Sequence, residues 1–503
     1  MRQILREPEK LTSEKFDLIV IGGGIYGVMI SLISAQRGLK ALLLEKDDFG
    51  GATSYNHLRI IHGGLRYLQK LDLHRFFESV SERRWFFQKF PEYIDPLACL
   101  MPLYGKGVYR PSIFRGALLL NDLLSINRNK GVDMKRRLEN GRVVGPKEVE
   151  KMFPGVDKEG LKGGAVWYDG SAPDTQRVLI EILKWADSLS SSSLNYMEAS
   201  ELIKDEKSVI GVKAFDRIKR RYFNFHSDKV INAAGPWCRE LSEAFDKDNE
   251  DLFKPSMAYN VLFDVEAPSG HALAVSPKKE NGQTYFLRPW KGRLLAGTIH
   301  EKWSGIEKNP FPSEESINNF IDDLNMTISE LNLTKENILH IYSGLLPARE
   351  EGTNKLAVRE EIFDHSENGG PKGLFTVSGV KFTTARLVAE KVIDKVYPDK
   401  NEKVYHLEPE NNPDPNLGVF GFNWTPDNGN EEKMMNSLKK IIETESVQHL
   451  DDLIFRRTTL GDNLVNAVKI APKLCGLFEW DDKKCLEEVE RVKIYYKNFR
   501  RND

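Results

Sequence analysis

The residues from Gly22 to Gly27 have the types and spacing of a turn that binds the phosphates of a nucleotide. The segment reads Gly-Gly-Gly-Ile-Tyr-Gly, contains the pattern G-x-G-x-x-G, and directly follows an apolar run at 16–21. The first glycine of such a pattern permits a tight turn, the second lets the backbone approach the phosphates, and the third lets the helix pack against the strand. Unpaired N–H groups at the positive end of the helix dipole then face the pyrophosphate.

A carboxylate occupies the position expected for a ribose contact. Residues 41–44 form a second apolar strand that ends in Glu45, eighteen residues after Gly27. In a dinucleotide site a carboxylate at this position accepts hydrogen bonds from the ribose hydroxyls. Strand, glycine turn, helix, strand and acid follow in the right order, so the sequence predicts a nucleotide site.

Other segments are expected to build the sheet around this site. A helix is predicted to begin at Asp174 or Thr175, and the serine run 190–193 is expected to end it as a loop. The short apolar segment 229–237 is expected to return to the nucleotide sheet as a strand. A strand at 374–379 leads into a helix at 387–396, which places a second helix N-terminus at the end of a strand.

Two further regions differ in pattern from the nucleotide sheet. Residues 285–298 alternate around Lys291-Gly292, which predicts a hairpin and an antiparallel sheet between 256 and 340. Residues 398–430 are rich in Asn, Pro, Asp and Gly and are predicted to be a linker. Beyond them, apolar residues repeat on one helical face, which predicts a small helical tail.

Composition excludes several classes of protein. Lys and Arg number 72 against 74 Asp and Glu, so a nucleic-acid partner is not expected. The four cysteines lack metal-ligand spacing and do not suggest a disulfide framework, so we expect no metal site and a reducing compartment. No signal peptide is evident, and no segment approaches the ~20 apolar residues of a membrane-spanning helix. These observations predict a cytoplasmic protein.

One segment leaves a membrane contact open. Residues 113–124 are apolar and are flanked by Arg110, Arg115, Arg128 and Lys130. A basic-rimmed apolar helix can lie in the interface of a membrane, here its inner face. The alternative is a helix buried against its own domain.

Several motifs together resemble the FAD-dependent glycerol-3-phosphate dehydrogenases, which belong to the flavoproteins of the amino-acid-oxidase type. The specific block is Ile61-His62-Gly63-Gly64-Leu65-Arg66-Tyr67-Leu68. The further matching motifs are the glycine turn, Leu42-Leu43-Leu44-Glu45, Ala52-Thr53-Ser54, Asn232-Ala233-Ala234-Gly235-Pro236-Trp237, Tyr342-Ser343-Gly344, Val358-Arg359, Gly379-Val380-Lys381-Phe382-Thr383-Thr384 and, in the tail, the segment 449–457.

The resemblance implies an α/β fold with three parts: a Rossmann-like FAD-binding domain, a mixed antiparallel-sheet substrate domain and a small helical C-terminal domain. The boundaries that we expect are 15–105, 161–255 and 341–400 for the FAD-binding domain, 106–160 and 256–340 for the substrate or cap region, and 401–503 for the linker and helical domain. The expected cofactor is non-covalent FAD, with electrons passed to a quinone or to oxygen.

The resemblance also assigns site residues. The expected cofactor contacts are Gly22, Gly24, Ile25, Tyr26, Gly27, Glu45, Lys46, Ala52, Thr53, Ser54, His62, Gly63, Gly64, Ala234, Gly235, Gly344, Gly379, Lys381, Phe382, Thr383 and Thr384. Lys381 and the helix start at 383–384 are expected to stabilise negative charge on the reduced flavin.

The expected catalytic residues are His62, Arg66, Tyr67, His300 and Arg359. Arg66 and Arg359 are predicted to hold an anionic substrate, and Tyr67 to donate a hydrogen bond. Either histidine is a candidate base, because an unperturbed imidazole titrates near neutrality. The alternatives are a backbone-bonded loop histidine at 62 and a surface ion pair at 359.

The chain departs from the family pattern at three places near the active site. The family has an arginine two residues after Tyr-Ser-Gly, where this chain has Leu346. The family sequence Gly-Thr-Thr-Asp becomes Gly-Thr-Ile-His at 297–300, and the small Ser-rich stretch with Lys becomes Tyr-Asn-His-Leu-Arg at 55–59. Leucine cannot replace the bidentate phosphate contact of a guanidinium.

The predicted activity is therefore hydride transfer from a small polar, anionic secondary alcohol to flavin N5, with glycerol 3-phosphate as the reference substrate. Leu346 favours a second possible function for the same scaffold, that of an amine, amino-acid or 2-hydroxy-acid oxidase or dehydrogenase. A NAD-dependent enzyme, or a nucleotide-binding module without turnover, is the alternative of a different class.

Overall fold

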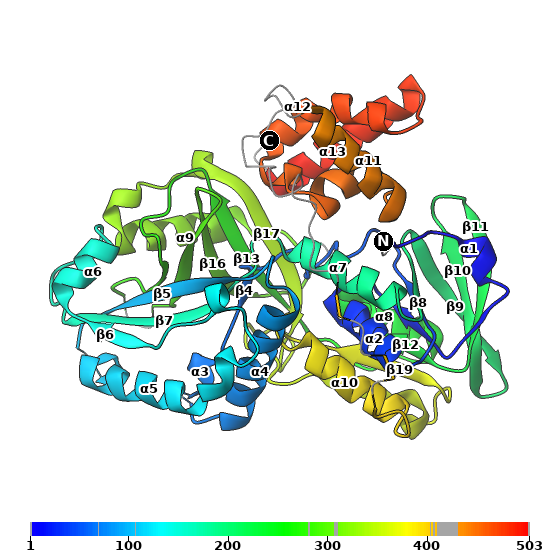
Figure 1. Ribbon diagram of the computed structural model, residues 1–503, viewed down its shortest axis with the longest axis horizontal. Helices are drawn as coiled ribbons and strands as arrows, with labels where there is room; N and C mark the ends of the chain where they lie inside the picture. The colour runs from blue at the N-terminus through cyan, green and yellow to red at the C-terminus, as the bar shows by residue number, and fades with distance from the viewer. Residues whose placement is uncertain are drawn as a thin grey trace.

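The computed structural model describes residues 3–500 apart from 69, 106, 280–281, 306–309, 403, 406–407 and 410–430. Most of the predicted linker at 398–430 therefore lies outside the described residues. Figure 1 shows three groups of elements: an α/β region around α2, a second sheet region around β5 and β13, and a group of helices near the C-terminus.

The first region is built on a six-stranded sheet of the nucleotide-binding kind. Its strand order is β18-β19-β12-β2-β3-β8, parallel throughout except for β18, which runs antiparallel to β19. The strands are β2 (Leu18–Ile21), β3 (Ala41–Leu44), β8 (Ser191–Leu194), β12 (Val230–Asn232), β18 (Glu361–Asp364) and β19 (Leu374–Ser378). As predicted, the strand at 230–232 lies inside this sheet.

This sheet is covered on both faces, which explains its uninterrupted apolar strands. In β2, Leu18 and Val20 join the core beneath the helices, whereas Ile19 and Ile21 join the core on the opposite face. The helices are α2 (Ile25–Gln36), α7 (Thr175–Asp187) and α10 (Ala385–Val396), with α2 packed against the other two. The opposite layer is an antiparallel meander joined by β1: β1 (Lys15–Phe16), β9 (Met197–Asp205), β10 (Ser208–Asp216) and β11 (Arg221–Ser227). Helices α1 (Pro8–Leu11) and α8 (Cys238–Phe245) belong to the same region.

The second region is a nine-stranded mixed sheet of mainly antiparallel strands. Its order is β17-β13-β16-β15-β14-β5-β7-β4, with β6 also pairing with β7. The strands are β4 (Ile60–Ile61), β5 (Asp95–Leu103), β6 (Arg142–Val144), β7 (Gly163–Ser171), β13 (Pro255–Phe263), β14 (Ala272–Val275), β15 (Tyr285–Trp290), β16 (Arg293–Lys302) and β17 (Ile338–Pro347). The predicted hairpin is present as β15 and β16, with Trp290 paired to Arg293.

Helices cover both faces of the second sheet. The core on one face contains side chains of α6 (Pro146–Met152) and α9 (Glu314–Thr327), and the core on the other contains Phe114 and Leu118 of α5 (Pro111–Leu124). Near α5 lie α3 (Leu65–Leu68) and α4 (Leu73–Lys89). The aromatic side chains of α4 at 85–87 belong to the core of the first region.

Strand pairing departs from the expected domain boundaries. The expectation placed 95–103 and 163–171 in FAD-binding segments, but β5 and β7 pair with each other in the second sheet over their whole length. β17 also crosses the expected boundary at 340 and remains in the second sheet. Alternating apolar residues predict that a strand exists, but they do not identify its partner.

The serine run was expected to be a loop, and this prediction is wrong. Residues 191–194 form β8, which pairs in parallel with β3 at the edge of the six-stranded sheet. The Oγ of Ser191 donates to the Ala41 carbonyl, and the Oγ of Ser193 donates to Asp187. These bonds satisfy the hydroxyls, so a low β-propensity does not prevent the strand from forming.

The third region is the predicted helical tail. It contains α11 (Glu431–Thr444), a π-helix at Asp452–Arg457, α12 (Leu464–Leu474) and α13 (Asp482–Arg500) around one apolar core. Cys475 and Cys485 form a disulfide, so the expectation of no disulfide is wrong. They are ten residues apart and meet because the chain turns back between α12 and α13, which their spacing does not reveal.

Helix α5 is much less buried than the expectation of a helix packed against its own domain required. Only Phe114 and Leu118 are buried, whereas Leu119, Leu123 and the following Ile126 are 59%, 69% and 75% exposed. Among the described residues, no helix has both the length and the apolar character needed to cross a membrane.

Candidate functional site

A cavity of about 1570 Å³ lies where the six-stranded sheet meets the second sheet. It extends from the glycine turn past the loop after β3 to the strands β13, β16 and β17. Most of the predicted cofactor residues line it, namely Gly22, Gly24, Ile25, Tyr26, Glu45, Lys46, Ala52, Thr53, Ser54, Ala234, Gly235, Gly344, Gly379, Lys381 and Phe382.

The glycine turn leaves no room for a side chain at Gly22 or at Gly27. Gly22 has φ +108°, and a Cβ there would lie 2.6 Å from the Ala233 carbonyl oxygen. A Cβ on Gly27 would lie 1.9 Å from the Gly22 carbonyl oxygen. Gly27 itself does not line the cavity, but it lets α2 begin directly behind the turn.

Glu45 is half-buried next to this turn. Its Oε2 accepts from the Gly23 N–H at 2.5 Å, and its Oε1 accepts from the Asp47 N–H at 2.9 Å. Burial, assisted by the charge of Asp47, raises the pKa of Glu45 to about 7. A carboxylate so placed is suited to accept hydrogen bonds from a ribose.

Two side chains connect distant parts of the cavity wall. The Ser54 Oγ accepts from the Ile25 N–H at 2.9 Å, which holds the loop after β3 against the start of α2. The Tyr26 hydroxyl donates to the Lys381 carbonyl and accepts from the Lys381 N–H, both at 2.9 Å. The loop between β19 and α10 is thereby fixed to the glycine turn.

His57 faces the cavity with a free donor and was not predicted as a site residue. Its Nδ1 accepts from the Arg59 N–H at 3.0 Å, and its ring stacks on Phe382 with centroids 4.9 Å apart. Burial, together with the charge of Arg59, lowers the pKa of His57 to about 3. The neutral ring therefore carries its proton on Nε2, which is buried and unbonded among the described residues.

These features fit FAD. The turn and the α2 N-terminus offer N–H groups for the pyrophosphate, Glu45 offers a ribose acceptor, and unbonded polar atoms of Asn56 and His57 line the same cavity. When bound, FAD accepts a hydride from substrate. Residues of the chain bind the substrate and accept the proton of its hydroxyl group.

The second sheet forms the other wall. Asn260, Thr298 and His300 come from β13 and β16, and Leu346 comes from β17, two residues after Gly344. The Thr298 hydroxyl donates to Asn260 Oδ1 at 2.7 Å. The Nδ1 of His300 is buried without a partner among the described residues, and burial together with the charge of Arg66 lowers its pKa.

Of the five predicted catalytic residues, His300 lines the cavity and the other four do not. Tyr67 lies close, because Lys381 Nζ is 4.1 Å from its ring centroid. Arg66 lies close enough to His300 for its charge to lower the pKa of the histidine. The charge of Arg359 acts on Asp72 and Glu360, and its side chain is exposed.

His62 is half exposed and belongs to a cluster with Asp169. Its Nδ1 lies 3.4 Å from Asp169 Oδ2, while Asp169 Oδ1 accepts from the Gly63 N–H at 2.7 Å and from Arg83 Nη1 at 2.8 Å. Burial alone would raise the pKa of Asp169, but the hydrogen bond and charge of His62 and the charge of Arg83 hold it at about 2. Asp169 and Arg83 are far from His62 in the sequence, so spacing gave no signal for them.

The other predicted cofactor residues support the site from outside the cavity. Gly63 and Gly64 lie against α4, where a Cβ on Gly64 would lie 2.9 Å from the Ser79 Cβ. Thr383 is buried, and Thr384 is the N-cap residue of α10.

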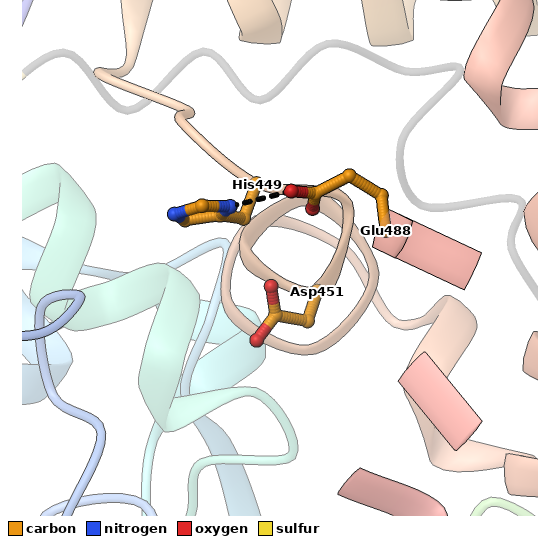
Figure 2. Close-up of side chains that lie close together, drawn as sticks. All are labelled: His449, Asp451 and Glu488. Carbon is orange, nitrogen blue, oxygen red and sulfur yellow. Dashed lines mark hydrogen bonds and ion pairs between the residues drawn. The ribbon is translucent and has the colours of Figure 1, made fainter. Parts of the chain in front are cut away.

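His449, Asp451 and Glu488 form a compact group in the C-terminal helices (Figure 2). Figure 2 shows the bond from His449 Nδ1 to Glu488, which is 2.8 Å long. Lys484 and Arg491 lie beside these carboxylates: Lys484 pairs with Glu488 at 2.7 Å and Arg491 with Asp451 at 3.0 Å. Because cations already compensate the carboxylates, we interpret the group as an ion-pair network and assign no metal to it.

Known proteins agree with this architecture. The family model for FAD dependent oxidoreductases matches residues 17–395. The glycerol-3-phosphate dehydrogenase of Synechocystis sp. is 29% identical over 93% of this chain and 84% of its own length. The aerobic glycerol-3-phosphate dehydrogenase of Staphylococcus aureus is 30% identical over 77% of this chain and 68% of its own.

Solved structures show the same fold. The glycerol-3-phosphate dehydrogenase of Bacillus halodurans, complexed with FAD, superposes with a TM-score of 0.71 at 20% identity over 98% of this chain and 97% of its own. The L-alpha-glycerophosphate oxidase of Mycoplasma pneumoniae, with FAD bound, gives 0.54 at 15% identity over 79% and 97%. The chain belongs to the FAD-dependent oxidoreductase family.

Proposed function

We propose that this FAD-dependent oxidoreductase oxidises a small polar secondary alcohol that carries an anionic group, with glycerol 3-phosphate as the reference substrate. The charge of the substrate wall carries the proposal. Among the described residues, those that β13, β16 and β17 contribute to the cavity include no carboxylate. The side chain of Lys381 lines the same cavity from the loop between β19 and α10, and Arg66 lies close enough for its charge to act on the neutral His300. Such a wall favours an anion over a cation.

His300 is the stronger candidate for the base. Its lowered pKa keeps the imidazole neutral near pH 7, and its buried Nδ1 is free to accept the hydroxyl proton. His62 is half exposed, and its Nδ1 faces Asp169. We therefore assign His62 the role of orienting the segment 62–67, not the role of the base. Lys381 is placed to stabilise negative charge beside the cofactor.

The experiment is anaerobic reduction of the purified yellow protein. Glycerol 3-phosphate, other phosphorylated alcohols, 2-hydroxy acids and amino acids are added in turn, and bleaching of the flavin band is recorded. The proposal expects bleaching by an anionic secondary alcohol. A protein without a flavin spectrum, or one bleached by amines alone, contradicts it.

Leu346 supports a second candidate function. This side chain lines the wall at the position where the resembled family has arginine, and it cannot bind a phosphate. A 2-hydroxy acid, an amino acid or an amine then becomes the substrate of the same scaffold. The bleaching panel separates the two candidates directly.

The electron acceptor is a quinone or oxygen in this proposal. After substrate has reduced the flavin, reoxidation by air-saturated buffer is compared with reoxidation by a soluble quinone. Rapid recovery of the flavin band with oxygen identifies an oxidase, and recovery with the quinone alone identifies a dehydrogenase.

We also propose that α5 contacts the inner face of a membrane. Leu119, Leu120 and Leu123 are exposed on this helix, and Arg110 and Arg115 are exposed at its start. Leu71, which follows the neighbouring α3, is 80% exposed. An apolar helix face with basic residues suits an anionic lipid interface.

Vesicle flotation tests this contact. The wild-type protein is expected to float with vesicles that contain anionic lipid, and Leu119→Glu combined with Leu123→Glu is expected to abolish flotation. Equal flotation of both proteins would rule out α5 as the contact.

A further inference from the structure

Two adjacent arginines of the C-terminal π-helix have different surroundings. Arg457 is fully buried and makes two hydrogen bonds to the Asp48 carboxylate, at 2.6 and 2.7 Å. Among the described residues, Arg456 has no carboxylate within ion-pair distance, and it lines the cofactor cavity. Its Nη1 is buried, and no carbonyl or carboxylate oxygen of the described residues accepts from it, while the Tyr495 hydroxyl lies within hydrogen-bonding reach of the guanidinium. Arg457 therefore has a structural partner, whereas the guanidinium of Arg456 is available to a ligand.

The guanidinium of Arg456 is held at one place in the cavity. It lies over the Tyr55 ring at 4.6 Å and near the Tyr495 ring at 5.4 Å, and its Nη2 is 3.5 Å from the Gly51 carbonyl oxygen. Gly51 belongs to the loop that Ser54 holds against the N-terminus of α2. That helix start is where phosphates of a dinucleotide bind.

The other cations that line the cavity contact residues other than the phosphate loop. Lys46 lies over the Trp237 ring at 3.8 Å, and Lys381 lies over the Tyr67 ring at 4.1 Å. Arg491 is paired with Asp451 at 3.0 Å. Of the lysines and arginines among the described lining residues, Arg456 is thus the one that contacts the phosphate loop, through Gly51, without a carboxylate in hydrogen-bond contact, although the charges of Asp48 and Asp451 act on it.

The C-terminal region is also firmly attached where it approaches this loop. The Tyr196 hydroxyl donates to Asp452 at 2.6 Å, and Asn195 Nδ2 donates to the Ser446 carbonyl at 2.8 Å and to Asp48 at 2.9 Å. These bonds, with the Arg457–Asp48 pair, hold the π-helix in a fixed position. An arginine positioned in advance loses little side-chain freedom when it binds an anion.

We propose that Arg456 binds the pyrophosphate of the FAD cofactor, so that the C-terminal helical region completes a site otherwise built by the six-stranded sheet. This inference rests on the assignment of FAD to the cavity. Arg456 would add a charge-assisted contact to the N–H groups that the α2 N-terminus offers the pyrophosphate. The role of the C-terminal region is then cofactor retention.

The test measures FAD binding by the full-length protein. Wild type, Arg456→Met and Arg456→Lys are stripped of flavin and titrated with FAD, and the quenching of flavin fluorescence gives Kd. Arg456→Met is expected to raise Kd about ten- to a hundredfold, because a hydrogen bond to a charged group is lost. Arg456→Lys is expected to lie between the two, since it keeps the charge without the planar fork.

Arg491→Met is the matched control, because Arg491 lines the same cavity but its charge is paired with Asp451. Its Kd for FAD is expected to stay within about twofold of wild type. Circular dichroism establishes that each variant is folded, and Arg456→Lys serves as the reporter if Arg456→Met is not.

Three results would overturn the proposal. They are an unchanged Kd in the Arg456 variants, an equal rise in Arg456→Met and Arg491→Met, and a change in substrate KM while FAD binding is unaffected. The last result would assign the guanidinium to the substrate. The proposed activity is tested separately. It is contradicted if the flavin of the wild-type protein is not bleached by any anionic alcohol.

Discussion

The two walls of the cavity are built from different parts of the polypeptide. On the cofactor side, backbone N–H groups, glycines without space for a Cβ and the half-buried carboxylate of Glu45 form the surface. On the substrate side, side chains such as Asn260, His300 and Leu346 project from paired strands. The first wall cannot change without moving the backbone, whereas the second can change one side chain at a time. A substitution on the substrate side can therefore alter substrate choice without disturbing the cofactor side.

A methyl group in the glycine turn is the most severe test of this difference. Gly27→Ala places its Cβ 1.9 Å from the Gly22 carbonyl oxygen, so the turn must open. We expect a protein that retains no flavin, measured by the ratio of visible to ultraviolet absorbance. Gly116→Ala on α5 is the control, because nothing lies within 4 Å of its Cβ. It should retain flavin and gain up to ~1 kcal/mol of stability. Full flavin content in Gly27→Ala would show that the cofactor wall is as tolerant as the other.

The next effect concerns the buried ion pair behind the segment 62–67. Asp169→Asn leaves Arg83 buried without a charged partner, which should lower the free energy of unfolding by about 3–5 kcal/mol in a urea titration. The pKa of Asp169, lowered from 3.8 to about 2, gives the sign of the pH effect. Its stabilisation is present above pH 3.8 and is lost as the pH falls towards 2.

The exposed Asp251 is paired with Lys254 and provides the control for this variant. Asp251→Asn should leave unfolding unchanged, because exposed ion pairs contribute little. If both variants unfold alike, the cluster of His62, Arg83 and Asp169 does not stabilise the substrate side.

Restoring arginine on the substrate wall sharpens the comparison. In Leu346→Arg we expect kcat/KM for glycerol 3-phosphate to rise by about tenfold or more relative to 2-hydroxy acids, because a guanidinium can bind phosphate in a bidentate manner. The FAD Kd should not change. Leu346→Met is the control for altered packing. A loss of FAD affinity in Leu346→Arg would show that the two walls are not independent.

The smallest expected effect is a pH dependence on the cofactor side. The pKa of Glu45 is raised to about 7, so without cofactor the folded protein holds this proton and loses stability as the pH rises from about 4.5 to 7. Ribose hydroxyls donate to the ionised form, so FAD affinity should rise as the pH increases through 7. The expected gain is about tenfold between about pH 6 and pH 8. Titration of Glu45→Gln should show a flat profile, and an equal slope in both proteins would assign the effect to another group.

The sequence alone determined the cofactor wall. Gly22, Gly27 and Glu45 act through local backbone geometry, and the order of strand, turn, helix and strand fixes where they lie. The hairpin at 285–298 and the helical tail were predicted for the same reason, since each depends on a local pattern. The FAD-dependent family was predicted from the resemblance of several short motifs to those of a known family.

Only the tertiary structure decided which distant segments meet. Asp169 and Arg83 join His62, β5 and β7 enter the second sheet, Cys475 pairs with Cys485, and Arg456 reaches the cofactor loop. None of these contacts leaves a periodicity or spacing in the chain. They arise from long-range strand pairing and from helices packing around a shared core, and these depend on the whole sequence at once.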